Sequence, residues 1–169
     1  MPRAAFVFLN GFAAIALAAG IAMLSGTPFI FPSLGPTAFM LFFAPGERAA
    51  SPRSALGGHA VGIVCGWAAL ALFGLGHDPA AFVSGVDLAR VGCAALALAA
   101  TGALMVALDV VHPPAGATTL IVALGIIEQP AYLLVIEAAV ALLVAQAWVV
   151  NRLAGIPYPL WDTPLEGRR

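Results

Sequence analysis

The chain has little charge, no lysine and almost no cysteine. Of its 169 residues, 62% are hydrophobic and only 9% are charged, and all seven cations are arginines. A soluble domain needs a more polar exterior, so the composition predicts a protein whose solvent is lipid. The net charge of −1 and the lack of a basic stripe give no reason to expect nucleic acid as a partner.

The two cysteines and the sequence motifs also argue against a metal or redox site. Cys65 and Cys93 both lie in apolar runs and are expected to be free packing residues. No CxxC pair, zinc-ligand spacing or HExxH motif occurs. We therefore expect no metal and no cofactor.

Long hydrophobic runs are what the chain does have. Four of them match the roughly 20 apolar residues that a helix needs to cross a bilayer. They cover residues 5–24, 55–75, 88–108 and 131–150. The first is too long for the apolar part of a signal peptide and is interpreted as a span. The sequence predicts an all-α membrane protein with four full transmembrane helices.

Two shorter apolar segments are interrupted by proline and glycine and resemble each other. The first is PSLGPTAF at residues 32–39, and the second is HPPAGATT at residues 112–119. Aligning the first proline of PSLG with the first of HPPAG pairs Gly35 with Gly116 and Thr37 with Thr118. Helices over 36–44 and 114–127 would rise about 13 and 21 Å, less than about 30 Å of hydrocarbon. Such matched broken segments point to a transporter binding site.

Two architectures compete for these broken segments. Either both are re-entrant hairpins beside four spans, or each crosses as an extended strand plus a half-helix, which makes six crossings. Six crossings collect most arginines on one side, as the positive-inside rule expects. That side would hold Arg3, Arg48, Arg53, Arg152, Arg168 and Arg169, and the other would hold His77, Asp78, Asp87, Arg90 and Glu128.

The six-crossing arrangement implies an inverted repeat. Each half then has an odd number of crossings, so the second half must be inverted relative to the first. We expect a 3+3 inverted repeat, with repeat 1 at about 5–75 and repeat 2 at about 88–151. Both would lie in one transmembrane domain over residues 1–155, followed by a cytoplasmic tail at 156–169. Both termini would then be cytoplasmic.

The starts of the two half-helices are the predicted anion site. A helix that begins inside the membrane has unpaired N–H groups and a partial positive charge at its first turn. Proline fits that turn and glycine allows close approach. The predicted substrate-binding residues are Ser33, Gly35, Pro36, Thr37, His112, Pro114, Gly116, Thr118 and Thr119. In the alternative interpretation, proline and glycine only kink helices for packing, and the hydroxyls cap the kinks.

Four ionisable residues at or near membrane depth are candidates for proton coupling. They are His59, Asp109, His112 and Glu137. Asp109 precedes His112 by three residues, which is close enough to orient or charge its ring if that turn is helical. Structural roles, such as helix capping and packing, stay open for all four.

Three glycines at fourfold spacing, Gly58, Gly62 and Gly66, lie on one helical face. Small residues at this spacing let helix backbones approach closely, either within the chain or between copies. This pattern leaves a homo-oligomer open.

Three blocks in order, PSLGPTAFMLFFAP, SPRSALGGHAVG and DVVHPPAGATTLI, together resemble the HPP family of integral membrane proteins. The family is named for the triplet that is here His112, Pro113 and Pro114. It is usually described with four spans, and some plastid and cyanobacterial members are nitrite transporters. The resemblance implies a permease for nitrite or another small anion, which we expect in the bacterial cytoplasmic membrane.

The leading hypothesis is therefore a permease, not an enzyme, that binds nitrite at the two half-helix starts with proton coupling as an added feature. One rival is an intramembrane metal-dependent enzyme in which His59, Asp109, His112 and Glu137 are ligands. A second is a membrane partner subunit that transports nothing.

Overall fold

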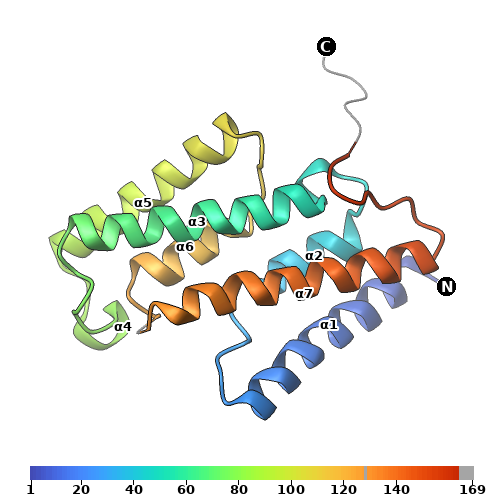
Figure 1. Ribbon diagram of the computed structural model, residues 1–169, viewed down its shortest axis with the longest axis horizontal. Helices are drawn as coiled ribbons and strands as arrows, with labels where there is room; N and C mark the ends of the chain where they lie inside the picture. Colours follow the sequence, from blue (N-terminus) through green and yellow to red (C-terminus); the bar gives the residue numbers. More distant parts are fainter. Residues whose placement is uncertain (128, 164–169) are drawn as a thin grey trace.

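The computed structural model describes residues 1–127 and 129–163 (Figure 1), so Glu128, Arg168 and Arg169 lie outside the described residues. Within them the chain is helical, with no strand. Four long apolar helices meet the length of a membrane span: α1 (Arg3–Ser25), α3 (Pro52–Leu72), α5 (Leu88–Ala107) and α7 (Ala131–Leu153). They confirm the four predicted runs.

Helix α3 begins three residues before its predicted start because capping, and not hydropathy alone, sets the end. The Ser51 side chain accepts a hydrogen bond from the backbone N–H of Ser54, and Pro52 occupies the first helical position. Proline is well suited there because that N–H has no partner within the helix.

Two short helices replace full spans in the interrupted segments. They are α2 (Leu34–Phe43) and α6 (Ala115–Ala123). At about 15 and 14 Å they are roughly half as long as the hydrocarbon core is thick. The second ends earlier than predicted because Gly125 turns the chain with a φ of 71°. A 3-10 turn, η1 (Arg48–Ala50), and a one-turn helix, α4 (Ala81–Ser84), lie in connections and were not predicted.

Helices α1 and α3 begin at the same end of the molecule, where α2 and α7 finish (Figure 1). The end of α5 lies near the start of α3, since Arg53 Nη2 donates to the carbonyl of Leu108, just after α5, at 3.1 Å. Arg3 Nη2 donates to the carbonyl of Phe43, the last residue of α2, at 2.8 Å. The N–H of Arg53 donates to the Trp161 carbonyl in the segment after α7, at 2.8 Å. We call this the arginine end. It follows that residues 26–43 bring the chain back to the end from which α1 started.

The two short helices run in opposite directions. Helix α2 runs toward the arginine end, and α6 runs away from it (Figure 1). At the far end, the Arg90 guanidinium at the start of α5 donates to the carbonyl of Ala123, the last residue of α6. Both short helices start in the middle of the molecule.

Packing pairs each short helix with a long helix from the other half of the chain. Helix α3 packs on α6 and α5, whereas α7 packs on α2 and α1. A Cβ added at Gly62 would lie 2.8 Å from the Ala115 carbonyl oxygen, and one at Gly66 would lie 2.8 Å from Val122 Cβ. The glycine face of α3 thus serves packing against α6, which confirms the close-packing prediction.

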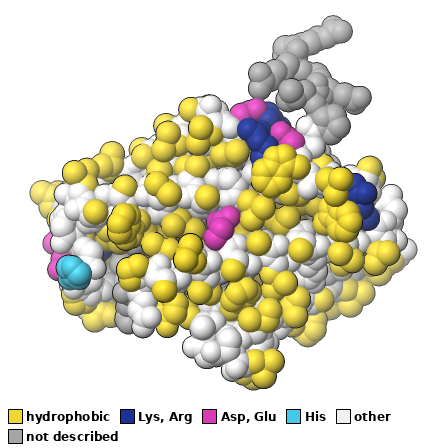
Figure 2. Space-filling model, viewed as in Figure 1, with side chains coloured by type: hydrophobic (Ala, Val, Ile, Leu, Met, Phe, Trp, Pro, Cys, Tyr) yellow, Lys and Arg dark blue, Asp and Glu magenta, His cyan; other side chains and the backbone are white. Residues whose placement is uncertain are grey.

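The exterior is apolar along the lengths of the helices. Figure 2 shows hydrophobic side chains over most of one face, with charged groups sparse among them. Large exposed hydrophobic residues include Phe8, Phe12, Trp67, Val91 and Leu134. Such a surface suits lipid and not water.

Candidate functional site

Four polar side chains meet in the interior where α2, α3 and α6 come together. Thr37 lies on α2, His59 on α3 and Thr118 on α6, while His112 lies just before α6. All four side chains are fully buried. The structure thus joins members of both predicted half-helix starts with two of the predicted proton-coupling residues.

A continuous series of hydrogen bonds links these groups. His59 Nδ1 lies 2.7 Å from Thr118 Oγ1, and His59 Nε2 lies 2.9 Å from Thr37 Oγ1. The same threonine oxygen lies 3.3 Å from His112 Nε2. His112 Nδ1 then lies 2.6 Å from the carbonyl oxygen of Ala49. Imidazole and hydroxyl groups connected in this way can relay a proton, because each can both donate and accept.

The glycines of α3 allow the two histidines to come close. A Cβ at Gly58 would lie 2.7 Å from His112 Cβ, so any larger residue would displace that ring. The ring centroids of His59 and His112 are 5.1 Å apart. Helix packing therefore sets the geometry of the cluster.

Ser33 is the N-cap residue of α2 and is fully buried, yet its hydroxyl caps nothing. Its Oγ has no hydrogen-bond partner among the described residues. A buried hydroxyl without a partner is costly, and water or a ligand commonly supplies the missing bond. Ser33 adjoins the cluster, since Thr37 Oγ1 lies within hydrogen-bond distance of the Ser33 carbonyl oxygen, at 2.9 Å.

Three of the predicted proline and glycine residues, Gly35, Pro36 and Pro114, line a different feature. Gly35 and Pro36 of α2 border an apolar groove of about 640 Å³ together with Pro113, Pro114 and Ala117. This groove shows that the starts of α2 and α6 are neighbours. Polar and apolar members of the predicted site are thus separated, with the polar ones on the buried side.

The first amides of α6 are less free than a bare helix start would be. The N–H groups of Ala115, Gly116 and Ala117 donate to the carbonyls of His112, Pro113 and Pro114. An anion near this start would therefore depend on hydroxyls, imidazole and the helix dipole more than on these amides.

Thr119 belongs to a second hydroxyl pair on the α5 side of α6. Its Oγ1 lies 2.9 Å from Thr101 Oγ1, and both residues are fully buried. Gly116 faces the same side, since a Cβ there would lie 3.3 Å from Leu98 Cδ1.

Asp109 lies in an ion cluster at the arginine end. Its carboxylate accepts hydrogen bonds from Arg48, and its carbonyl accepts one from Arg53 at 2.9 Å. Asp162 joins through Arg53 at 3.1 Å. The carboxylate hydrogen bond raises the pKa of Arg48 above its usual value. Asp109 has a φ of 60°, a left-handed conformation that aspartate tolerates better than most residues.

Glu137, the fourth predicted proton-coupling residue, is half-buried on α7. Its Oε2 has no hydrogen-bond partner among the described residues. No described hydrogen bond joins it to His59 or His112, so its coupling role stays a prediction.

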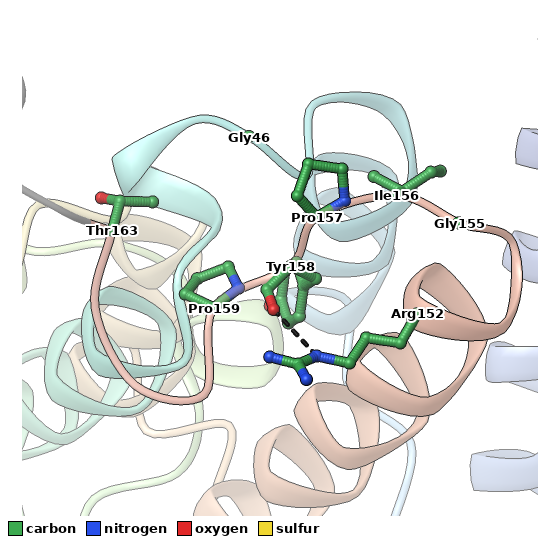
Figure 3. Close-up of a pocket in the computed structure, with 8 residues that line it drawn as sticks. All are labelled: Gly46, Arg152, Gly155, Ile156, Pro157, Tyr158, Pro159 and Thr163. Atoms are coloured by element: carbon green, nitrogen blue, oxygen red, sulfur yellow. Dashed lines mark hydrogen bonds between the residues drawn. The ribbon is translucent and has the colours of Figure 1, made fainter.

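A separate cavity of about 810 Å³ lies at the arginine end, where the segment after α7 folds back (Figure 3). Arg152 Nε donates there to the Tyr158 carbonyl at 3.1 Å. The buried Tyr158 hydroxyl donates to the Ala50 carbonyl at 2.7 Å, and burial raises its pKa above the usual value. None of the predicted site residues lines this cavity.

Metal binding finds no support among residues 1–127 and 129–163. No group of three or more His, Cys, Asp or Glu side chains there is arranged to hold a metal ion. The two histidines of the enzyme hypothesis meet, but its Asp109 pairs with Arg48.

Sequence reasoning missed two groups of this region. The Ala49 carbonyl, which fixes His112, carried no signal because any residue supplies a backbone oxygen. Thr101 carried a weak sequence signal, since a hydroxyl inside an apolar run needs a hydrogen-bond partner. Its hydroxyl donates to the Ala97 carbonyl at 2.8 Å.

The chain matches the family model described as HPP, transmembrane region, over residues 1–159. It matches no curated protein and no solved structure. The match includes both interrupted segments and all four long helices. This protein therefore belongs to the HPP family of integral membrane proteins, as its three motif blocks predicted.

Proposed function

We propose that this protein is a membrane permease for a small inorganic anion, with nitrite as the first candidate. The observation that carries the proposal is that two short helices start side by side in the middle of the molecule and run apart in opposite directions. Membership of a membrane family and four apolar helices of spanning length agree with transport.

The anion would bind on the buried side of the two starts. Both helix dipoles direct partial positive charge to this region. Ser33 offers a buried hydroxyl without a described partner, and Thr37 and Thr118 offer further hydroxyls nearby. Positive helix ends facing an anionic substrate at mid-depth are a known solution in secondary transporters.

Two internal correspondences support the proposed 3+3 inverted repeat. Thr37 and Thr118, paired by the motif alignment, contact opposite nitrogens of His59. The last carbonyl of each short helix accepts a bond from an arginine near the start of the preceding long helix. In this proposal, residues 26–43 and 108–123 each cross as an extended strand plus a half-helix.

The charge distribution supports cytoplasmic termini. The arginine end holds Arg3, Arg48, Arg53 and Arg152, and the far end holds His77, Asp78, Asp87 and Arg90. By the positive-inside rule, the arginine end would face the bacterial cytoplasm.

Uptake of [15N]nitrite into proteoliposomes at alkaline pH tests the proposal. Nitrite is then almost wholly ionised, and empty vesicles measure the leak of the neutral acid. The wild type should exceed empty vesicles, and Gly116→Leu should abolish the excess because its side chain would collide with Leu98 of α5 and displace the start of α6. Gly102→Leu is the matched control, since a Cβ at Gly102 meets nothing within 4 Å.

Two outcomes would count against the permease. Wild-type uptake equal to that of empty vesicles favours the partner-subunit alternative. Full nitrite uptake by a folded Gly116→Leu variant would show that the short-helix starts do not lie on the transport pathway.

A further inference from the structure

We propose that His112 takes up one proton together with each anion, so that the two are carried in a 1:1 ratio with no net charge. This inference rests on the proposed function and adds to it the residue and the stoichiometry. It follows from counting hydrogen-bond donors and acceptors in the buried cluster.

The Nδ1 atom of His112 must carry a hydrogen. Its partner at 2.6 Å is the Ala49 carbonyl oxygen, which can only accept. A neutral His112 therefore has a bare Nε2, and that nitrogen faces Thr37 Oγ1 at 3.3 Å.

Thr37 has one hydroxyl proton for three neighbours. The Ser33 carbonyl, at 2.9 Å, can only accept. If Thr37 donates there, its oxygen must receive hydrogens from both imidazole rings. His59 can do this while neutral, because its Nδ1 then accepts from Thr118 at 2.7 Å. His112 can do it only as a cation.

The cluster is therefore satisfied in two states that differ by one proton. In the neutral state, Thr37 turns its hydroxyl hydrogen to His112 Nε2. In the protonated state, His112 donates to Thr37, and Thr37 donates to Ser33. Binding of a proton to His112 Nε2, with rotation of the Thr37 hydroxyl toward the Ser33 carbonyl, converts the first state into the second, and no helix has to move.

A second proton is disfavoured on electrostatic grounds. The ring centroids of His59 and His112 are 5.1 Å apart in a fully buried site. Two imidazolium ions at that separation would repel each other strongly in a low-dielectric interior. The pair thus holds one added proton at most.

The added charge needs a counter-ion that the described residues do not provide in contact with the ring. The groups that face His112 are His59 from α3, Thr37 from α2, the Ala49 carbonyl from η1 and Gly58. Asp109, the charged residue nearest to His112 in sequence, is paired with Arg48, which precedes Ala49. A buried imidazolium without an anion is costly, so proton and anion should bind together.

Calorimetric titration of purified protein with sodium nitrite tests this directly. Runs at pH 8 in two buffers of different ionisation enthalpy report the protons taken up per nitrite bound. We expect close to one proton, and an apparent affinity that falls about tenfold per pH unit through linkage.

Two glutamine variants assign the proton. His112→Gln keeps a side-chain donor but cannot ionise, so nitrite should bind more weakly with no proton uptake. His77→Gln, at an exposed loop position, should behave as wild type. Proton uptake that persists in His112→Gln would overturn the assignment.

The wild type alone also tests the stoichiometry, should His112→Gln fail to fold. In proteoliposomes with the potential clamped by potassium and valinomycin, a pH gradient should drive nitrite accumulation beyond the leak of empty vesicles, and a potential should not. Accumulation driven by potential, or nitrite binding without proton uptake, overturns the inference but leaves the permease intact. No nitrite binding by the wild type overturns both.

Discussion

The two short helices of this protein are built alike but differ at one position just before each helix. Each contributes a threonine to His59, and each ends on a carbonyl that accepts from an arginine. In the motif alignment, however, His112 precedes Pro113 where Phe31 precedes Pro32. Both residues are buried, but only His112 can carry a proton.

This difference separates two tasks. The features suited to an anion, a helix start and a hydroxyl, occur in both halves. The titratable side chain at this position occurs in one half, where it bonds to the Ala49 carbonyl of the connection before α3. In our account the repeats share substrate binding, while proton binding belongs to the second half.

Arg3 and Arg90, which bond to the last carbonyls of α2 and α6, provide the sharpest test of how alike the two short helices are. Arg90 is 2% exposed and donates to Ala123 and Pro79 carbonyls at 3.3 and 3.0 Å, whereas Arg3 bonds at a surface. Hydrogen bonds from a charged group contribute about 1.5–3 kcal/mol each, so Arg90→Gln should lower the free energy of unfolding by roughly 3 kcal/mol. Arg3→Gln should have little effect. Unfolding by SDS titration measures both, and equal losses would contradict this distinction in burial.

The next largest loss of stability is expected where the glycine face of α3 contacts α6. Gly62→Ala adds a Cβ 2.8 Å from both the Ala115 carbonyl and Thr119 Oγ1. Overpacking of this kind costs about 1–3 kcal/mol. Gly35→Ala is the control in the other half, since a Cβ there meets nothing within 4 Å. If Gly62→Ala unfolds no more easily than Gly35→Ala, α3 and α6 are not in close contact.

Replacing Thr37 or Thr118 should lower stability by similar amounts, but the two replacements should differ in their effect on nitrite-linked proton uptake. Thr37→Val and Thr118→Val each remove a hydroxyl from His59, and each should cost about 0.6–2 kcal/mol. Thr37→Val should also reduce nitrite-linked proton uptake, because only Thr37 contacts both histidines. Thr37→Ser, which keeps the hydroxyl, should restore it. Calorimetry in two buffers distinguishes these variants, and unchanged proton uptake in Thr37→Val would exclude the two-state cluster.

The smallest effect is expected at the arginine end, where Tyr158 holds the connection between α2 and α3. Loss of its hydrogen bond to Ala50 in Tyr158→Phe should cost about 1 kcal/mol. Burial raises the pKa of the folded-state phenol above its ordinary value of 10.0. The contribution of the buried Tyr158 hydroxyl to the free energy of unfolding is therefore complete below pH 10 and falls as pH rises above 10. Thermal unfolding should show this loss of stability at alkaline pH in the wild type. An equal loss in Tyr158→Phe would show that groups other than Tyr158 cause it.

Much of this architecture was predictable because lipid imposes simple rules. Runs of apolar residues located α1, α3, α5 and α7, and paired proline and glycine breaks located α2 and α6. His59 and His112 were candidates because ionisable groups are rare at membrane depth. The glycine spacing on α3 predicted close packing, which the α6 contacts bear out.

The partners of these residues were not predictable, since they depend on contacts between distant segments. Asp109 was a candidate to orient His112 through sequence spacing, and nothing in the sequence indicated that its carboxylate would bond to Arg48, 61 residues away. His112 pairs with Ala49, 63 residues away, and Thr119 pairs with Thr101 through side-by-side packing of α5 and α6. Hydropathy and spacing contain no information on such pairings.

Solid-state NMR on the protein in lipid tests the central claim most directly. With [15N]nitrite and 13C-labelled histidine and threonine, we predict dipolar contacts from nitrite to His112 and Thr37, assigned by their loss in His112→Gln and Thr37→Val. Contacts confined to residues of the arginine end, or no specific contact at all, would contradict an anion site at the two helix starts.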